Sequence, residues 1–178
     1  MNDTRSIRVR GPFGPMWLWA TEFGLCGAGF GAEISPADVR RLGRYGVAYP
    51  EAGSTLLLEE AGAQMTAYFD QRLRVFSLPL DLRGTAFQQA VWEMLLQVPY
   101  GETITYGEIA LELGRPRSSQ AVGQAVAANP VAIVVPCHRV VGRNGALTGY
   151  KTGVGHKALL LQLEHAGLQL RMPLEQDL

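Results

Sequence analysis

Apolar and polar positions along the chain predict a β-hairpin near the N-terminus. Two runs rich in apolar residues, 16–21 and 25–30, flank the turn residues Glu22-Phe23-Gly24, which is the pattern of two antiparallel strands joined by a short loop. Cys26 lies inside the second run, where we expect it to be a packing residue. The preceding residues 1–10 are polar and are expected to form a frayed or edge segment.

Two helices and an extended stretch are predicted between the hairpin and residue 84. Ser35 followed by Pro36 is a favourable helix start, and this short helix is expected to end near Gly46. A longer helix is predicted over 55–71, because its apolar residues recur at helical spacing. Residues 75–84 are then expected to be extended chain that ends in a linker to a second unit.

Helical spacing becomes more regular after this linker. Two capping boxes, each a threonine followed three residues later by glutamine or glutamate, mark helix starts at Thr85 and Thr105. The first helix is predicted to end before Pro99, and the second at Gly114. A third helix is expected over 120–128, capped by one of the two serines before it.

The second and third of these helices, joined by a tight turn, have the form of a helix-turn-helix. The third helix has few long polar side chains and several small residues, among them Ala121 and Gly123. Such a surface cannot read bases in the major groove, but it suits shallow insertion into a minor groove without sequence specificity. An internal helix packed closely on its neighbours would have the same composition, so spacing alone leaves both interpretations open.

A short buried strand is predicted over 131–135, where five apolar residues, mostly β-branched, follow one another. Pro136 has no N–H to donate and must end the strand, so Cys137 and His138 follow a rigid element. A thiol held beside an imidazole is a candidate nucleophile, although free cysteine is also among the most commonly buried residue types. Neighbouring strand residues point to opposite faces, so a bridging water suits this pair better than direct contact.

Composition limits the classes of protein and partner. The 178 residues are 47% apolar and 18% charged, as in an ordinary globular protein, and 16 basic residues balance 16 acidic ones. Over 83–171 eight basic residues oppose five acidic ones, so a local basic patch remains possible. Nothing in the chain predicts a metal site, a cofactor or a membrane span. Without a signal-peptide pattern we expect a reducing cytoplasm, not a disulfide between Cys26 and Cys137.

The last part of the chain is expected to contain a tight turn at Asn144-Gly145, a glycine-containing loop and a final helix. That helix is predicted over 156–166, closed by Gly167, and its Glu164 would ordinarily be a solvated surface charge. The fold class is therefore α/β (α+β), a small N-terminal β-sheet with a helix followed by a mostly helical unit. We expect domains over 1–80 and 81–171, and a tail over 172–178.

The residues around Cys137 resemble the active-site signature of the O6-alkylguanine-DNA alkyltransferases. The most specific part is Ile133-Val134-Val135-Pro136-Cys137-His138-Arg139-Val140, preceded by Asn129-Pro130. The resemblance covers 80–167 almost continuously, whereas the N-terminal part matches only in general layout. Other matching segments are Gly84-Thr85-Ala86-Phe87, Pro99-Tyr100-Gly101-Glu102, Thr105-Tyr106, Ala121-Val122-Gly123 and Leu147-Thr148-Gly149-Tyr150.

This resemblance implies a DNA repair protein that alkylates itself. Family members bind double-stranded DNA through the minor groove, flip O6-alkylguanine into a pocket, and move the alkyl group irreversibly to a cysteine. By alignment Cys137 is the acceptor, His138 deprotonates it through a water, and Glu164 orients and stabilises the imidazolium. Tyr106 would donate its hydroxyl toward the guanine leaving group. Asn129 would connect the predicted helix over 120–128, which is the recognition helix of the helix-turn-helix, to the Pro-Cys-His-Arg loop.

The alignment also implies which residues contact DNA and the flipped base. Backbone groups of Cys137, Val140 and Lys151 would line the polar edge of the guanine. The other positions assigned to substrate or DNA binding are Thr105, Gln120, Ala121, Gly123, Arg139 and Tyr150. Gln120 stands where the family typically has an arginine that fills the space left by the flipped base, so we expect weaker or slower engagement of DNA. Lys151-Thr152 replaces small residues, which bears on the alkyl size that is tolerated.

Two other functions fit parts of the sequence. A non-catalytic lesion-binding protein of the same fold is favoured only by Gln120, and relatives of that kind replace the cysteine that is present here as Cys137. A cysteine hydrolase would bring its base from elsewhere in the sequence, and only His156 and His165 are available. We therefore predict a single-turnover methylated-DNA–protein-cysteine methyltransferase that acts as a cytoplasmic monomer and needs no cofactor.

Overall fold

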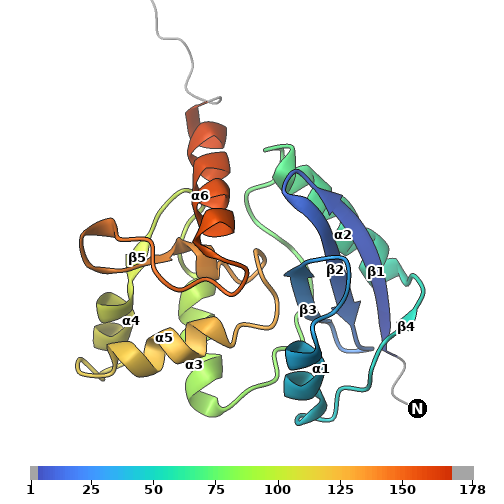
Figure 1. Ribbon diagram of the computed structural model, residues 1–178, viewed down its shortest axis with the longest axis horizontal. Coiled ribbons are helices and arrows are strands. Elements are labelled where there is room, and N and C mark those ends of the chain that lie inside the picture. Colours follow the sequence, from blue (N-terminus) through green and yellow to red (C-terminus); the bar gives the residue numbers. More distant parts are fainter. Residues whose placement is uncertain (1–3, 170–178) are drawn as a thin grey trace, which may run out of the picture.

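The computed structural model describes residues 4–169, in which a small N-terminal sheet lies beside a C-terminal group of helices (Figure 1). This confirms the predicted α+β class. The main sheet has the order β3-β2-β1-β4, built from β1 (Arg5–Gly11), β2 (Gly14–Ala20), β3 (Leu25–Phe30) and β4 (Glu51–Ala52). The predicted tail over 172–178 lies outside the described residues. None of the helices within 4–169 has the length and apolar character needed to cross a membrane.

Six α-helices and a second, two-stranded sheet complete the described chain. The helices are α1 (Pro36–Gly43), α2 (Leu56–Phe69), α3 (Ala86–Leu96), α4 (Tyr106–Glu112), α5 (Ser119–Ala127) and α6 (Val154–Gln169). The small sheet pairs β5 (Ile104–Thr105) with β6 (Val140–Val141) in parallel. Short 3₁₀ turns lie at Cys137–Arg139 and Arg143–Gly145.

The polar N-terminal residues form a strand and not a frayed end. β1 pairs antiparallel with β2 along its whole length, from Arg5 opposite Ala20 to Gly11 opposite Gly14. Only Arg5 and Ser6 pair with the two-residue strand β4 on the other side. Most of β1 therefore lies at the edge of the sheet. The expectation of an edge segment is confirmed, and that of a frayed segment is wrong.

Helix starts follow the predicted caps at Ser35, Thr85 and Thr105. At α5 the N-cap residue is Ser118, as expected, but its side chain makes no capping hydrogen bond. The Ser35 hydroxyl accepts a hydrogen bond from the backbone N–H of Asp38 at 3.1 Å, and both predicted capping boxes, at Thr85 and at Thr105, are complete. These motifs connect residues only three positions apart, so the local sequence is sufficient to specify them.

The end of α6 differs from the prediction. The helix runs to Gln169, so Gly167 lies inside it and does not close it. A Cβ atom at Gly167 would lie 2.5 Å from the Tyr100 hydroxyl, so the glycine permits close packing. The Asn144-Gly145 turn forms, with φ of 59° and 76°, but no second strand follows it to make a hairpin.

The predicted strand over 131–135 is wrong. The segment is a buried turn in which Ile133 has a φ of 74°, and it forms only isolated bridges. The side-chain amide of Asn129 binds backbone groups of this turn that a neighbouring strand would otherwise pair with. Its Oδ1 accepts from Val131 N at 3.0 Å, and its Nδ2 donates to Val135 O at 2.8 Å. β-Branched apolar residues suit any fully buried backbone, so periodicity could not separate a strand from this turn.

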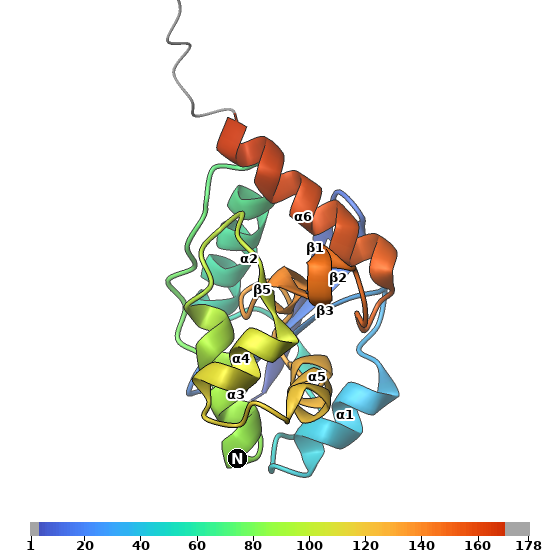
Figure 2. The same cartoon turned by 90° about the vertical axis from the view of Figure 1, so that its left-hand side faces the viewer.

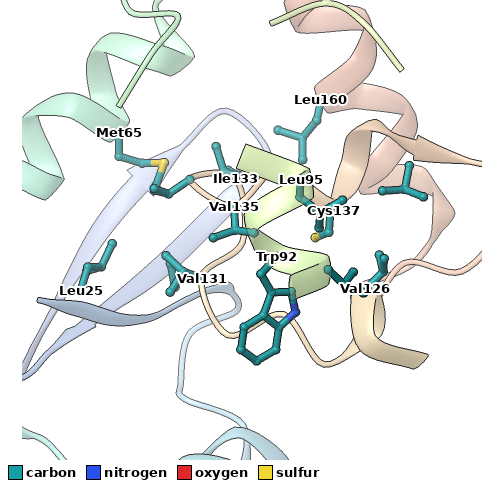
Figure 3. Packing of buried hydrophobic residues seen from close by; sticks show 14 of the residues in the cluster. Leu25, Met65, Trp92, Leu95, Val126, Val131, Ile133, Val135, Cys137 and Leu160 are labelled. Carbon is teal, nitrogen blue, oxygen red and sulfur yellow. The ribbon is translucent and has the colours of Figure 1, made fainter. Parts of the chain in front are cut away.

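The N-terminal sheet holds this buried turn in place. The N–H of Ala28 in β3 donates to Pro130 O at 2.9 Å, and Ala132 N donates to Ala28 O at 3.1 Å. One hydrophobic cluster continues from the sheet into the helices. Figure 3 shows Leu25 and Met65 in the same cluster as residues that surround Cys137. The position of the turn thus depends on packing between the two halves of the chain.

Candidate active site

Cys137 follows the buried turn and begins the 3₁₀ turn Cys137–Arg139. The residue is 8% exposed and lines a cavity of about 330 Å³, a volume typical of small-molecule sites. The cavity lies between the two halves of the chain, and its walls include Trp17, Phe30, Asp38, Asn129, Tyr150 and Lys151. A ligand in this cavity could therefore reach a thiol that is otherwise shielded from solvent.

The Cys137 thiol is not a ready-made thiolate. Burial raises its pKa above the usual value, and the effect is only partly offset by the neighbouring Asn129 amide and by the positive charge of Lys157. The thiolate is the nucleophilic form of cysteine, so the site needs a base that removes the proton during reaction.

His138 and Glu164 form a fully buried pair, with 2.7 Å between His138 Nε2 and Glu164 Oε1. The solvated position that periodicity alone suggested for Glu164 is therefore wrong. Burial would raise the pKa of Glu164, but hydrogen bonds from His138 and Arg139, together with the positive charge of Arg139, outweigh it and lower the pKa to about 2.

The charge of Glu164 fixes the tautomer of His138. An ionised carboxylate can only accept, so we assign the imidazole proton to Nε2. The pKa of His138 is lowered, chiefly by burial, which keeps the ring neutral. Its Nδ1 has no hydrogen-bond partner among the described residues. The site thus holds a neutral imidazole with a free lone pair in the residue that directly follows the thiol that needs a base.

Arg139 lies in the buried cluster around Glu164. By alignment it was assigned to substrate or DNA binding, but it is 6% exposed and binds Glu164 through Nε at 3.1 Å and Nη2 at 2.9 Å. Its Nη1 donates to Val98 O at 2.6 Å. A buried carboxylate needs a partner of opposite charge, and that requirement holds the guanidinium inside the protein.

Two further donors to Glu164 were not predicted from the sequence. Tyr68 donates its hydroxyl to Glu164 Oε1 at 2.8 Å, and Gly101 donates its backbone N–H to Oε2 at 3.0 Å. The sequence predicts Tyr68 only as part of the apolar stripe of α2. The sequence does place a tyrosine in this apolar stripe. A buried tyrosine hydroxyl usually finds a hydrogen-bond partner, and that rule could have indicated a polar role for Tyr68.

Two tyrosines and a buried lysine lie beside the cavity. Tyr106 donates its hydroxyl to Thr148 O at 3.1 Å, and Lys157 Nζ donates to the same carbonyl at 2.8 Å. The Lys157 Nζ lies 5.8 Å from the centre of the Tyr106 ring. Burial and the neighbouring Cys137 raise the pKa of Tyr150 well above its usual value, so its hydroxyl stays protonated next to the sulfur.

The remaining residues assigned to substrate or DNA binding do not line the cavity. Gln120 and Ala121 are exposed on α5, and Gly123 is half-buried against the Tyr106 ring. Thr105 caps α4 by exchanging hydrogen bonds with Glu108, whereas the Val140 side chain is buried. Within residues 4–169, no three His, Cys, Asp or Glu side chains are grouped so as to hold a metal ion.

Two family profiles match successive parts of the chain. Residues 9–82 match the family profile described as 6-O-methylguanine DNA methyltransferase, ribonuclease-like domain. Residues 86–166 match 6-O-methylguanine DNA methyltransferase, DNA binding domain. The two profiles meet near the linker.

Relatives similar in sequence are named methylated-DNA–protein-cysteine methyltransferases. A Mycobacterium leprae methylated-DNA–protein-cysteine methyltransferase is 52% identical over 115 residues, which is 65% of this chain and 68% of the relative. The Mycobacterium bovis relative is 56% identical over 101 residues, which is 57% of this chain and only 61% of that relative's length.

The structural match is more extensive than the sequence match. The Mycobacterium tuberculosis O6-methylguanine methyltransferase superposes with a TM-score of 0.77 and 41% identity, covering 98% of this chain and 97% of the other. The structure of Mycobacterium tuberculosis OGT in complex with DNA gives a TM-score of 0.79 and 40% identity, covering 92% and 94%. The chain belongs to the 6-O-methylguanine DNA methyltransferase family.

Proposed function

We propose that this protein repairs double-stranded DNA by moving the alkyl group of O6-alkylguanine irreversibly onto Cys137. The observation that carries the proposal is the buried Cys137 thiol in a cavity wall, followed directly by the His138–Glu164 pair. The names of the relatives and the DNA complex of a structural neighbour support the same activity. The intact cysteine argues against a lesion binder without catalysis.

The proposed reaction is a displacement at the alkyl carbon. His138 Nδ1 takes the thiol proton through a bridging water, and Glu164 stabilises the resulting imidazolium. The sulfur forms a bond to the alkyl carbon as the bond from that carbon to O6 breaks. The electron pair remains on the guanine, which takes a proton from the Tyr106 hydroxyl. The proton that His138 took from the thiol then returns through water to Tyr106, so that the imidazole and the phenol are both neutral again. The product is a thioether that water does not reverse, so each molecule acts once.

Other residues position these groups. Asn129 holds both ends of the turn before Cys137 through the two hydrogen bonds of its amide. Arg139 balances the charge of Glu164 and keeps it ionised. Backbone groups of Cys137, Val140 and Lys151 are proposed to bind the polar edge of the flipped guanine.

We propose that α5 enters the minor groove of DNA and that the protein acts as a monomer. Small and neutral residues on its exposed face, including Ala121, allow a close approach without base-specific contacts. Gln120 is proposed to occupy the space that the flipped nucleotide leaves. Because glutamine carries no charge, it adds nothing to attraction by the phosphates.

The test is the stoichiometry of repair. The protein is mixed with an increasing excess of a duplex oligonucleotide that contains one O6-methylguanine, and restored guanine is counted by chromatography. We expect a plateau at one guanine per protein molecule, and none with Cys137→Ser. Continued turnover would favour a hydrolase, and binding without any restoration would favour a non-catalytic lesion binder.

A further inference from the structure

An ion pair joins the two halves of the chain at the rim of the cavity. Lys151 Nζ contacts Asp38 Oδ1, and both residues line the cavity that holds Cys137. Asp38 belongs to α1 in the N-terminal half, whereas Lys151 follows Tyr150 in the C-terminal half. The Asp38 side chain is 2% exposed and that of Lys151 is 41% exposed, so the pair extends from the protein interior to the surface.

Asp38 is a fixed anchor for this ion pair. Its carboxylate also accepts hydrogen bonds from Ser35 Oγ at 2.6 Å and from Arg41 Nη2 at 2.5 Å. Arg41 in turn donates to Ala128 O at the end of α5, and Figure 2 shows α1 beside α5. With these two donors still in place, the carboxylate has little freedom to follow Lys151 if the loop moves.

The Lys151 segment is held less firmly. Residues 149–152 belong to no helix or strand, and Gly149 and Tyr150 form part of the cavity wall. Among the described residues, the contact of Lys151 with Asp38 is the one ion pair or hydrogen bond that links 149–152 to the N-terminal half. If this contact breaks, the wall next to Cys137 loses its polar link to α1 and opening it costs less free energy.

We propose that the Lys151–Asp38 ion pair limits the size of the alkyl group that can reach Cys137. This inference rests on the proposed alkyl transfer. On this proposal a methyl group is transferred with the wall closed, whereas transfer of a bulky aromatic group requires residues 149–152 to move outward, which separates the two charges. A partly exposed pair contributes about 1 kcal/mol. Loss of the pair is therefore expected to favour the bulky group about fivefold relative to methyl.

The test compares two free bases, O6-benzylguanine and O6-methylguanine, as alkyl donors to Cys137. Both are uncharged, so attraction to DNA phosphates plays no part. Lys151→Met keeps the length of the side chain and removes the ammonium group. We expect the ratio of benzyl to methyl transfer rates to rise about fivefold in Lys151→Met and to return toward the original ratio in Lys151→Arg. Arg143→Met removes a charge from the same part of the chain, outside the cavity, and should not change the ratio.

Salt provides a second readout, because a half-exposed ion pair is screened. The ratio should rise from about 0.05 M to about 0.5 M NaCl in the unmodified protein and stay constant in Lys151→Met. A third readout needs no activity: amide hydrogen exchange over 146–153 should become faster in Lys151→Met. An unchanged ratio with unchanged exchange would overturn the inference. Absence of methyl transfer by the unmodified protein would instead overturn the proposed function, and exchange would still test the ion pair.

Discussion

Among single residues, Glu164 holds together the buried polar groups that follow the Cys137 thiol. It accepts hydrogen bonds from His138, Arg139, Tyr68 and the backbone of Gly101, and all four hold it ionised inside the protein. The sequence predicts the partnership of Glu164 with His138 through the family resemblance. It could not predict Tyr68, which lies 96 positions away in another helix, because no local pattern records a contact at that separation.

Tyr68→Phe tests the contribution of this hydroxyl. We expect the free energy of unfolding to fall by about 1 kcal/mol, because a buried carboxylate loses one donor, and methyl transfer to slow. Urea denaturation and single-turnover kinetics would measure the two effects. Tyr100→Phe is the matched control, since the Tyr100 hydroxyl is buried without a partner among the described residues. Equal destabilisation by both changes would contradict this role for Tyr68.

The pKa of His138 makes a prediction about the pH dependence of the reaction. A base must be neutral to accept a proton, and burial lowers the pKa of His138 below its ordinary value of 6.5. The fraction of neutral imidazole therefore stays high as the pH falls through 6.5. We expect the acid limb of the methyl-transfer rate to have its midpoint below pH 6.5, measured with a free alkylated base so that DNA binding does not contribute. A midpoint at or above 6.5 would be inconsistent with this site.

For whole elements, local rules predict the helix starts but not the turn before Cys137. The capping boxes at Thr85 and Thr105 need only neighbours three residues apart. The turn over 131–135 depends on the Asn129 amide and on contacts with β3, which sequence periodicity does not record. The glycine rule places the end of α6 at Gly167, but the helix continues to Gln169, because Gly167 allows close packing against Tyr100.

Two glycines of α6 give a matched pair of substitutions. Alanine is normally preferred to glycine inside a helix by up to about 1 kcal/mol, and Gly155→Ala is expected to stabilise the protein because its Cβ would meet no atom within 4 Å. Gly167→Ala should instead destabilise it by about 1–3 kcal/mol, because the new Cβ would clash with the Tyr100 hydroxyl. Thermal denaturation would compare the two variants. Stabilisation by Gly167→Ala would show that the packing there is looser than described.

The exposed face of α5 makes a prediction about DNA binding. Gln120→Arg is expected to bind duplex DNA containing O6-methylguanine several-fold more tightly, with a steeper dependence on salt, because one more cation faces the phosphates. The measurement is an equilibrium titration in a Cys137→Ser background at several salt concentrations. Gln97→Arg adds the same charge at the end of α3 and is the control. Unchanged affinity and repair rate in Gln120→Arg would contradict the proposal that the uncharged side chain at position 120 weakens DNA binding.

In the whole molecule, the N-terminal half helps to build the site although it contains no residue that reacts. Trp17 and Phe30 of the sheet and Asp38 of α1 line the cavity, and β3 binds the turn before Cys137. The sequence predicts the α+β class and places the reactive residues in the second half. The shared cavity could not be predicted, because it depends on how the two halves pack together.

The most direct test of alkyl transfer is mass spectrometry of the protein after it is mixed with a duplex oligonucleotide containing O6-methylguanine. We expect the intact mass to increase by one methyl group in place of one hydrogen, and the modified peptide to be the one that contains Cys137. Cys26 should stay unmodified, because it is fully buried and burial raises its pKa to about 12. An unmodified Cys137, together with an oligonucleotide that keeps its methyl group, would contradict the account.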